Sequence, residues 1–287
     1  MPSLESGRIK LLALDIDGTL VDNAGHLRPN TRRALARAAE AGIRLVLCTG
    51  RRYRRALPLV LELGLDSPVV CNSGAIVKDP GNHTTLWRAD IDPAIVREVL
   101  AIFQEHNQPA ISFLDRSLAD SDFIVERNPV GRELFDDYLA QNEAYAEVRA
   151  DWHLPARLRW ISHWHLCAID DRPTMLKLEA AVVARLGASV RTFVQRSPRY
   201  LGTMCEVLRG DADKWTAVQK VASRWGIEPA SICAVGDDAN DLPMIRGAGL
   251  GVAMGHASDA VKQAADWITS DNETDGLARI VDHILDN

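Results

Sequence analysis

Strand-like and helix-like patterns of hydrophobic and polar positions alternate over the first part of the chain. Three segments read as buried strands, at residues 9–14, 43–50 and 68–75. The two segments between them place apolar residues at helical spacing, at residues 30–42 and 51–65. Asn30 is the expected N-cap of the first helix, and Gly42 is its expected stop. The order strand, helix, strand, helix, strand predicts a parallel sheet with right-handed crossovers.

The same alternation returns near the C-terminus. Two segments there are expected to be strands, at residues 231–238 and 250–255. Three more are expected to be helical, at residues 213–227, 240–249 and 257–269. This part of the chain therefore predicts further strands and helices for the same sheet.

A long stretch separates these two halves, and it is too long for a structureless loop. It contains strand-like segments at residues 110–115, 159–170 and 203–208 and helix-like segments at residues 93–106 and 173–187. We therefore predict a discontinuous core domain, residues 1–85 and 209–287, interrupted by an α+β domain at residues 86–208. The predicted fold class is α/β, with a Rossmann-like, doubly wound parallel sheet in the core.

Composition narrows the class of protein. The 287 residues suffice for two domains, and the net charge of −6 favours neither a nucleic-acid nor a membrane partner. No apolar run reaches the roughly 20 residues that span a bilayer, and the N-terminus lacks the apolar core of a signal peptide. The five scattered cysteines form no C-x-x-C pair and are expected to be reduced and mostly buried. We expect a cytoplasmic protein; the oligomeric state stays open.

Two carboxylates follow the first predicted strand. Asp15 and Asp17 are two residues apart and are followed by Gly18 and Thr19. In an extended segment they point to the same side, and two ionised carboxylates about 4 Å apart repel by roughly 4 kcal/mol at an effective dielectric near 20. One of them must be protonated, or a cation must lie between them. The alternative is a simple helix cap or turn, because Asp-Gly is a common turn dipeptide.

Other polar groups follow other predicted strands. Thr49 and Gly50 end the second strand, where a helix begins whose free amides could bind phosphate, although Thr-Gly is also an ordinary turn. Arg51, which follows, could face a ligand or the solvent, and the basic run 51–55 as a whole is interpreted as a solvated helix face rather than a nucleic-acid patch. Lys214 precedes a predicted helix, and a lone lysine is usually exposed.

The last predicted site is acidic. Residues 236–241, Gly-Asp-Asp-Ala-Asn-Asp, bring three carboxylates to one strand end. Such hard oxygen ligands suit Mg²⁺, which takes one or two carboxylates together with water and substrate phosphate. The alternative is a solvated acidic loop that contains an N-cap.

The four sites in this order resemble the haloacid dehalogenase superfamily of phosphohydrolases. Its four motifs correspond to residues 15–19, 49–51, 214 and 236–241. The closest branch is similar to the Cof-type proteins (class IIB), which carry an α+β cap between the second and third motifs. Three further segments are similar to that branch, namely Cys71–Ala75, Gly251–Ser258 and residues 273–285. The resemblance is strong in the core and loose in the cap.

The resemblance implies roles for individual residues. Asp15 is the implied nucleophile, which forms an aspartyl-phosphate, and Asp17 is the implied general acid and base. The implied cofactor is Mg²⁺ (magnesium), and its ligands would be Asp15, the main-chain carbonyl of Asp17, and Asp237. Asp241 would support this metal shell from outside. The phosphate would be held by Thr49, the Gly50 amide, Lys214 and Asn240.

Some positions depart from the family or stay ambiguous. Trp215 follows Lys214 where the family usually has glycine, and we expect it to change the substrate pocket. The role of Asp238 stays open. Four cap residues draw attention, namely Trp160, His163, Trp164 and His165. The two histidines share a face, but no third metal ligand is evident, so packing is favoured over a metal site. An aromatic wall for a sugar or heterocycle is the remaining alternative.

The leading hypothesis is a Mg²⁺-dependent phosphatase that acts on small organic phosphomonoesters, sugar phosphates first. Phosphoryl transfer between positions of a sugar, as in phosphomutase relatives, is the alternative within enzymes. A hydrolytic dehalogenase is disfavoured, because relatives with that chemistry lack the second Asp of the first motif. A non-catalytic sensor of phosphometabolites is the rival outside enzymes, although all the expected catalytic groups are present.

Overall fold

The computed structural model describes residues 9–125, 132–149, 162–196 and 200–286. The chain divides into two compact units: Met1–Trp87 together with Asp213–Asn287, and Arg88–Ala212. The second unit is thus inserted into the first. Its boundaries lie two and four residues beyond those expected from the sequence, at 88 and 212 rather than 86 and 208.

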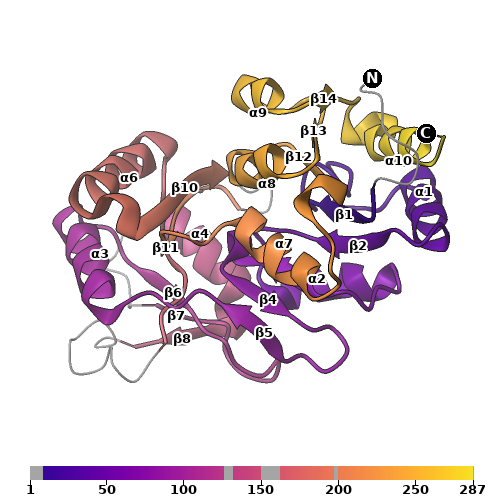
Figure 1. Ribbon diagram of the computed structural model, residues 1–287. Helices are drawn as coiled ribbons and strands as arrows, with labels where there is room; N and C mark the ends of the chain where they lie inside the picture. Colours follow the sequence, from indigo (N-terminus) through magenta and orange to yellow (C-terminus); the bar gives the residue numbers. More distant parts are fainter. Residues whose placement is uncertain (1–8, 126–131, 150–161, 197–199, 287) are drawn as a thin grey trace. The chain divides into compact units, whose positions relative to one another are not determined.

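The first unit is built on a five-stranded parallel sheet with the order β14-β13-β12-β1-β2 (Figure 1). Its strands are β1 (Leu11–Leu14), β2 (Arg44–Leu47), β12 (Ile232–Gly236), β13 (Leu250–Ala253) and β14 (Trp267–Ile268). β1 lies between β12 and β2, with Leu11 paired to Ile232 on one side and to Arg44 on the other. This arrangement confirms the predicted α/β fold class with a parallel core sheet.

Helices cover both faces of this sheet, as doubly wound sheets require. The helices of the first unit are α1 (Pro29–Glu40), α2 (Tyr53–Glu62), α7 (Lys214–Ser223), α8 (Leu242–Gly247), α9 (Asp259–Ala264) and α10 (Gly276–Asp286). Val46 packs in one apolar cluster with Val218 of α7 and Met244 of α8. Leu45, its neighbour in β2, points to the other face, where it lines a pocket with Leu35 of α1.

Some details differ from the sequence expectations. α1 begins after Arg28, with Pro29 in its first turn, so the expected N-cap at Asn30 is wrong; proline fits the first turn because the N–H that it lacks would have no helical partner there. The segment 257–269 is not wholly helical, because Trp267 and Ile268 form the edge strand β14 beside β13. Two strands were missed, β4 (Ile76–Lys78) and β5 (Thr85–Arg88), which form a three-stranded sheet with the expected strand β3 (Val69–Cys71).

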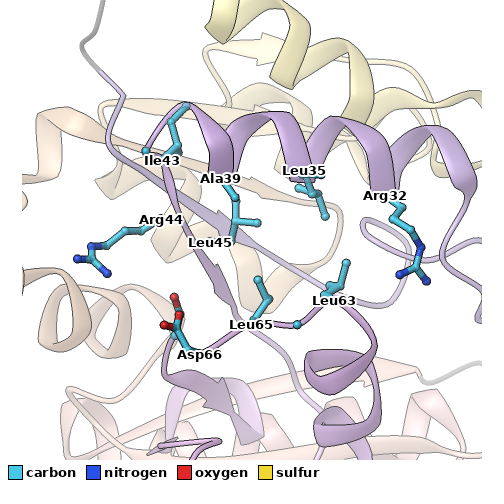
Figure 2. Close-up of a pocket in the computed structure, with 13 residues that line it drawn as sticks. Arg32, Leu35, Ala39, Ile43, Arg44, Leu45, Leu63, Leu65 and Asp66 are labelled. Atoms are coloured by element: carbon cyan, nitrogen blue, oxygen red, sulfur yellow. The ribbon is translucent and has the colours of Figure 1, made fainter.

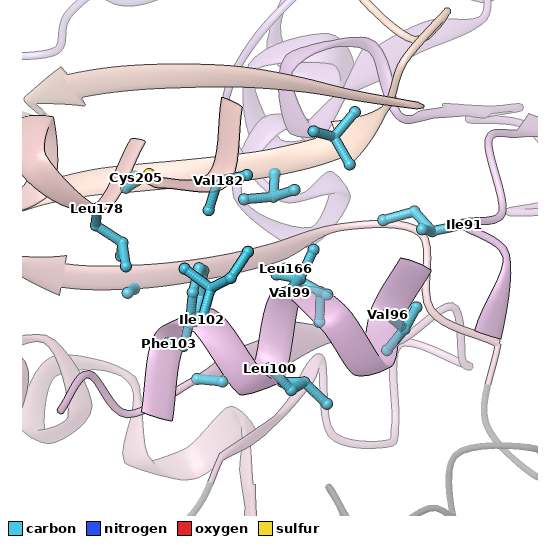
Figure 3. Packing of buried hydrophobic residues seen from close by; sticks show 14 of the residues in the cluster. Ile91, Val96, Val99, Leu100, Ile102, Phe103, Leu166, Leu178, Val182 and Cys205 are labelled. Atoms are coloured by element: carbon cyan, nitrogen blue, oxygen red, sulfur yellow. The ribbon is translucent and has the colours of Figure 1, made fainter. Parts of the chain in front are cut away.

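The second unit has a six-stranded mixed sheet with the order β10-β11-β9-β6-β7-β8. Its strands are β6 (Ile111–Phe113), β7 (Phe123–Val125), β8 (Ala146–Val148), β9 (Leu166–Asp170), β10 (Val190–Arg196) and β11 (Thr203–Arg209). Its helices are α3 (Pro93–Glu105), α4 (Glu133–Asn142) and α6 (Arg172–Leu186). α3 and α6 pack on the same face, where Ile102 and Val182 meet Leu166 of β9 (Figure 3).

The described residues bear on two further expectations, the state of the cysteines and the presence of a membrane-spanning helix. All five cysteines are buried, and none forms a disulfide, as expected. Burial raises the pKa of four of these thiols well above its ordinary value, namely Cys48, Cys71, Cys205 and Cys233. Among the described helices, none has the length and apolar character needed to cross a membrane.

Candidate active site

The first motif begins where β1 ends. The Asp15 amide still donates to the Val235 carbonyl of β12, at 3.0 Å, and the chain then turns back on the carbonyl of Ile16. Gly18 sits in this turn with φ +82°, and a Cβ atom there would lie 2.4 Å from an oxygen of Asp237. Both the positive φ and the close approach require glycine. The turn thus brings the first motif against the fourth.

Lys214 lies at the centre of the site. It is fully buried as the first residue of α7, and its Nζ contacts Asp15 Oδ1 at 2.6 Å and Asp241 Oδ1 at 2.5 Å. Burial by itself would lower the pKa of Lys214, but the two carboxylates outweigh it and raise that pKa above its ordinary value. Lys214 is therefore a charged bridge between two motifs, and the interpretation of an ordinary exposed lysine is wrong.

Asp15 is held in a strongly desolvated position. It is 6% exposed, and burial raises its pKa well above the usual range, while the charge on Lys214 opposes this shift. The neighbouring carboxylates of Asp241 and Asp237 raise it further. A site that keeps several carboxylates this close out of water favours a cation.

Both carboxylate oxygens of Asp241 are bonded to groups of the protein. Its Oδ1 contacts Lys214, and its Oδ2 accepts the amides of Asp237 and Asp238 at 2.9 and 3.1 Å. Asp238 in turn caps the 3-10 turn η5 (Ala239–Asp241) by accepting the amide of Ala239 at 2.7 Å. Asp238 is thus an N-cap, and Asp241 organises the loop from below.

Asp237 faces the first motif. Thr19 Oγ1 donates to Asp237 Oδ1 at 3.1 Å, and His256 Nε2 lies 3.6 Å from Oδ2. Burial raises the pKa of Asp237, while the neighbouring His256 opposes this shift, and Asp237 raises the pKa of His256 in turn. No role was expected for Thr19 or His256. Thr19 belongs to the first motif, so its place beside a carboxylate could have been anticipated.

Asp17 is paired with Arg51. The guanidinium donates from Nε to Asp17 Oδ2 at 2.7 Å and from Nη2 to Oδ1 at 2.6 Å, which is a bidentate ion pair. The Arg51 side chain is only 9% exposed, and Arg52 is buried as well. The interpretation of residues 51–55 as a solvated helix face is therefore wrong for its first two arginines. Arg51 points inward because its guanidinium pairs with the Asp17 carboxylate.

The expected phosphate-binding residues surround a buried loop. Thr49 is buried and its Oγ1 accepts the Arg51 amide at 3.0 Å, across Gly50, so it closes the turn after β2. Asn240 is also buried and donates from Nδ2 to Ser73 Oγ at 3.2 Å. The Ser73 amide donates to the Thr49 carbonyl at 3.0 Å. Ser73 thus links the second motif to the fourth.

The acidic residues have the geometry of a cation site. Oxygens of Asp15, Asp237 and Asp241 lie within 4.8 Å of one another, and no other group of three candidate ligands is found among the described residues. Because both Asp241 oxygens are already bonded, Asp15 and Asp237 are the carboxylates that fit a hard cation best. This chemistry suits Mg²⁺.

The aromatic candidates make packing contacts within their own units. Trp215 is partly buried and packs against the core cluster of the first unit, and a Cβ on Gly247 would meet its ring at 2.3 Å, which favours packing over a place in a substrate pocket. Trp164 and both cap histidines are buried; His163 contacts Ser112 at 2.8 Å. His165 lies against the Phe113 ring, with 4.5 Å between centroids. These contacts are packing contacts, as favoured. Trp160 lies outside the described residues.

A separate pocket of about 390 Å³ lies in the first unit (Figure 2). It is lined by α1, by residues 63–67 that follow α2, and by Arg44 and Leu45 at the amino end of β2. Asp15 follows the carboxyl end of the adjacent strand β1. The pocket is therefore at the opposite end of the sheet from the motifs and takes no part in the candidate active site.

Several known proteins are similar to this chain over nearly its whole length. A pyridoxal phosphate phosphatase of Escherichia coli is 29% identical and is matched over 95% of this chain and 97% of its own. A 5-amino-6-(5-phospho-D-ribitylamino)uracil phosphatase of Bacillus subtilis is 28% identical, over 94% and 96%. A haloacid dehalogenase-like hydrolase structure from Bacteroides thetaiotaomicron is 25% identical with a TM-score of 0.75, covering 96% of this chain and 99% of that one.

A second solved structure supports the fold. A subclass IIB sugar phosphatase of the superfamily has a TM-score of 0.76 at 22% identity, covering 96% of this chain and 98% of that one. The haloacid dehalogenase-like hydrolase family matches residues 12–281, which includes all four motifs and the inserted unit. The chain belongs to the haloacid dehalogenase-like hydrolase family.

Proposed function

We propose that this protein is a Mg²⁺-dependent phosphatase that hydrolyses small organic phosphomonoesters through an aspartyl-phosphate on Asp15. One observation carries the proposal: Lys214 joins Asp15 to Asp241 inside a buried cluster at the carboxyl ends of β1 and β12. Ligands of open parallel sheets bind at this edge. The relatives named as phosphatases, which match nearly the whole chain, support the same reaction class.

Asp15 is the proposed nucleophile. One carboxylate oxygen forms a bond to phosphorus while the bond from phosphorus to the ester oxygen breaks. Lys214 holds Asp15 Oδ1 at 2.6 Å, which fixes the direction of the carboxylate. Water then attacks the phosphorus of the aspartyl-phosphate, and inorganic phosphate leaves as Asp15 is restored.

Asp17 is the proposed general acid and base. It would donate a proton to the departing ester oxygen and later accept a proton from the attacking water. Its carboxyl group is oriented by the two hydrogen bonds from Arg51. Its main-chain carbonyl would be the atom that contacts the cation, and proton transfer at the carboxyl would require Arg51 to release one of its two oxygens.

The remaining groups would hold the phosphate and the cation. The proposed phosphate contacts are Thr49, the Gly50 amide, Lys214 and Asn240, which would stabilise charge on the phosphoryl oxygens. Asp15, Asp237 and the Asp17 carbonyl would hold Mg²⁺, with Thr19 and Asp241 steadying the loops that carry them. When bound, the cation offsets the repulsion between Asp15 and the phosphate.

The substrate class is a phosphate monoester of modest size. Sugar phosphates remain the first expectation, and the two relatives act by name on phosphate esters that contain a heterocycle: pyridoxal phosphate and a phosphoribitylamino-uracil. We therefore propose phosphates of sugars and phosphates of small heterocycles as the two candidate substrate classes. The inserted unit is the proposed cap that would select among them.

A panel of phosphate esters, assayed with Mg²⁺ and after chelation, tests the function. We expect release of inorganic phosphate that requires Mg²⁺, and Asp237→Ala should need far more Mg²⁺ or be inactive. Formation of a positional isomer without phosphate release would indicate a phosphomutase instead. Binding without any turnover would indicate a sensor, and full activity after exhaustive metal removal would refute the metal role.

Intact-protein mass after an acid quench tests the two aspartates. Asp17→Asn keeps the nucleophile, so an aryl phosphate, whose leaving group needs no proton, should leave a phosphate adduct that breaks down slowly. Asp15→Asn should carry no adduct. An adduct on Asp15→Asn would assign the nucleophile to another residue.

A further inference from the structure

The loop Asn72–Gly74 (η1) adopts an unusual backbone conformation beside the candidate site. Three consecutive residues have positive φ: Asn72 at 50°, Ser73 at 55° and Gly74 at 96°. Asn and Gly tolerate this region, but serine seldom adopts it. Ser73 is fully buried, so the cause is not a loose surface turn. Something in the surrounding structure holds it there.

The loop is fixed from three sides by the motifs. The amides of Asn72 and Ser73 donate to the carbonyls of Arg51 and Thr49, both at 3.0 Å. A Cβ on Gly74 would lie 2.1 Å from the backbone carbon of Asp213, next to Lys214. The backbone therefore runs in van der Waals contact with the start of α7. A strained conformation persists only where neighbours determine it in this way.

The strained position presents the Ser73 hydroxyl to Asn240. The amide nitrogen of Asn240 donates to Ser73 Oγ at 3.2 Å, across 167 residues of sequence. Among the described residues, Ser73 is the hydrogen-bond partner of this buried amide. An amide group has a donor end and an acceptor end, and only the donor end can bind a phosphate oxygen. The bond uses one amide hydrogen and leaves the second for a ligand.

We propose that Ser73 is a positioning residue for phosphate, which it serves by holding the donor end of the Asn240 amide toward the bound phosphoryl group. The inference rests on the proposed function, because it assumes that phosphate binds at Asn240. Without the hydroxyl, the amide can rotate and present its oxygen, which phosphate repels. Ser73 would therefore lower the stability of the fold through backbone strain and raise its affinity for phosphate.

Two variants separate these effects because both remove the hydroxyl and only one of them relieves the backbone strain. Ser73→Gly relieves the positive φ and should unfold at the same or a higher temperature than the wild type. Ser73→Ala keeps the strain and should be no more stable. Both should bind inorganic phosphate about three- to tenfold more weakly, the effect expected for one lost hydrogen bond.

Asn107→Gly is the matched control. Asn107 also has a positive φ, at 55°, but it lies beyond the end of α3 in the second unit and is exposed. The substitution should leave phosphate affinity unchanged. A double-mutant cycle with Asn240→Ala completes the test: if Ser73 acts through Asn240, Ser73→Gly should cause no further loss in that background.

The measurements are calorimetric phosphate binding to the full-length, Mg²⁺-loaded protein, together with thermal unfolding and turnover of an aryl phosphate. Unchanged phosphate affinity in both Ser73 variants would overturn the positioning role while leaving the phosphatase proposal intact. An additive loss in the Asn240→Ala background would also overturn it. If the wild-type protein neither binds phosphate nor releases it from esters, the proposed function fails, and this inference fails with it.

Discussion

Replacing Lys214 with methionine tests how the site balances its charges. Methionine has a similar length and no charge, so the change removes the ion pairs to Asp15 and Asp241 without opening a large cavity. Breaking a buried ion pair by removing one partner typically costs about 3–5 kcal/mol, because a buried charge is left without compensation. Both carboxylates here are almost fully buried.

Proton uptake sets an upper limit to that cost. Asp15 should take up the proton, because burial raises its pKa well above the usual range. Protonating a carboxyl with an ordinary pKa near 3.9 costs about 4 kcal/mol at pH 7 and about 1.5 kcal/mol at pH 5. The free energy of unfolding should therefore fall by about 4 kcal/mol at pH 7 and by clearly less at pH 5.

Proton linkage gives the direction in which the stability of the Lys214→Met variant changes with pH. In the variant, burial raises the folded-state pKa of Asp15 above its unfolded value. The folded state then binds more protons than the unfolded state between those two values, so stability declines as the pH rises. Urea unfolding at pH 5 and pH 7, followed by tryptophan fluorescence, measures this decline.

Lys220→Met is the control for this prediction, because Lys220 is exposed on the same helix α7. It should change the free energy of unfolding by less than about 0.5 kcal/mol at either pH. A Lys214→Met loss that is the same at both pH values, or smaller than about 1 kcal/mol at pH 7, would refute the idea that Lys214 neutralises these carboxylates.

Three further predictions follow from packing and burial. Trp215→Leu should lower the free energy of unfolding by about 1–3 kcal/mol because the ring packs on Gly247, while the ranking of phosphate esters by kcat/KM stays unchanged. Gly18→Ala should reduce activity by at least tenfold, measured as initial rate, because its Cβ would displace Asp237. The native protein should react slowly with a thiol reagent and expose all five thiols in denaturant, measured by absorbance, because every cysteine is buried.

The sequence predicted the parts of the site that depend on strand order. Parallel strands bring their carboxyl ends to one edge, so Asp15 and Asp237, which follow adjacent strands, could be expected to meet. It also predicted the inserted unit, because so long a stretch between two halves of a sheet must fold by itself. The hairpin of β4 and β5 was missed although Asp79-Pro80-Gly81 between them is a turn signal.

The direction of a side chain at an element boundary could not be predicted in the same way. Trp215 is the second residue of α7, where either the core or a ligand pocket could receive a large ring; the small Gly247 on α8 decides in favour of the core. Arg51 belongs to a basic run that resembles a solvated face. Its inward position depends on Asp17, 34 residues earlier in the chain.

The backbone conformation of Ser73 could not be predicted from the local sequence, for a physical reason. The segment Asn72-Ser73-Gly74 reads as a turn, because asparagine and glycine favour positive φ. Nothing local requires the serine between them to share that conformation, which is unfavourable for its side chain. The requirement comes from Arg51, Thr49 and the start of α7, which hold the loop from separate parts of the sequence. Distant motifs thus override the local backbone preference of Ser73, so its role could be inferred only from the folded structure.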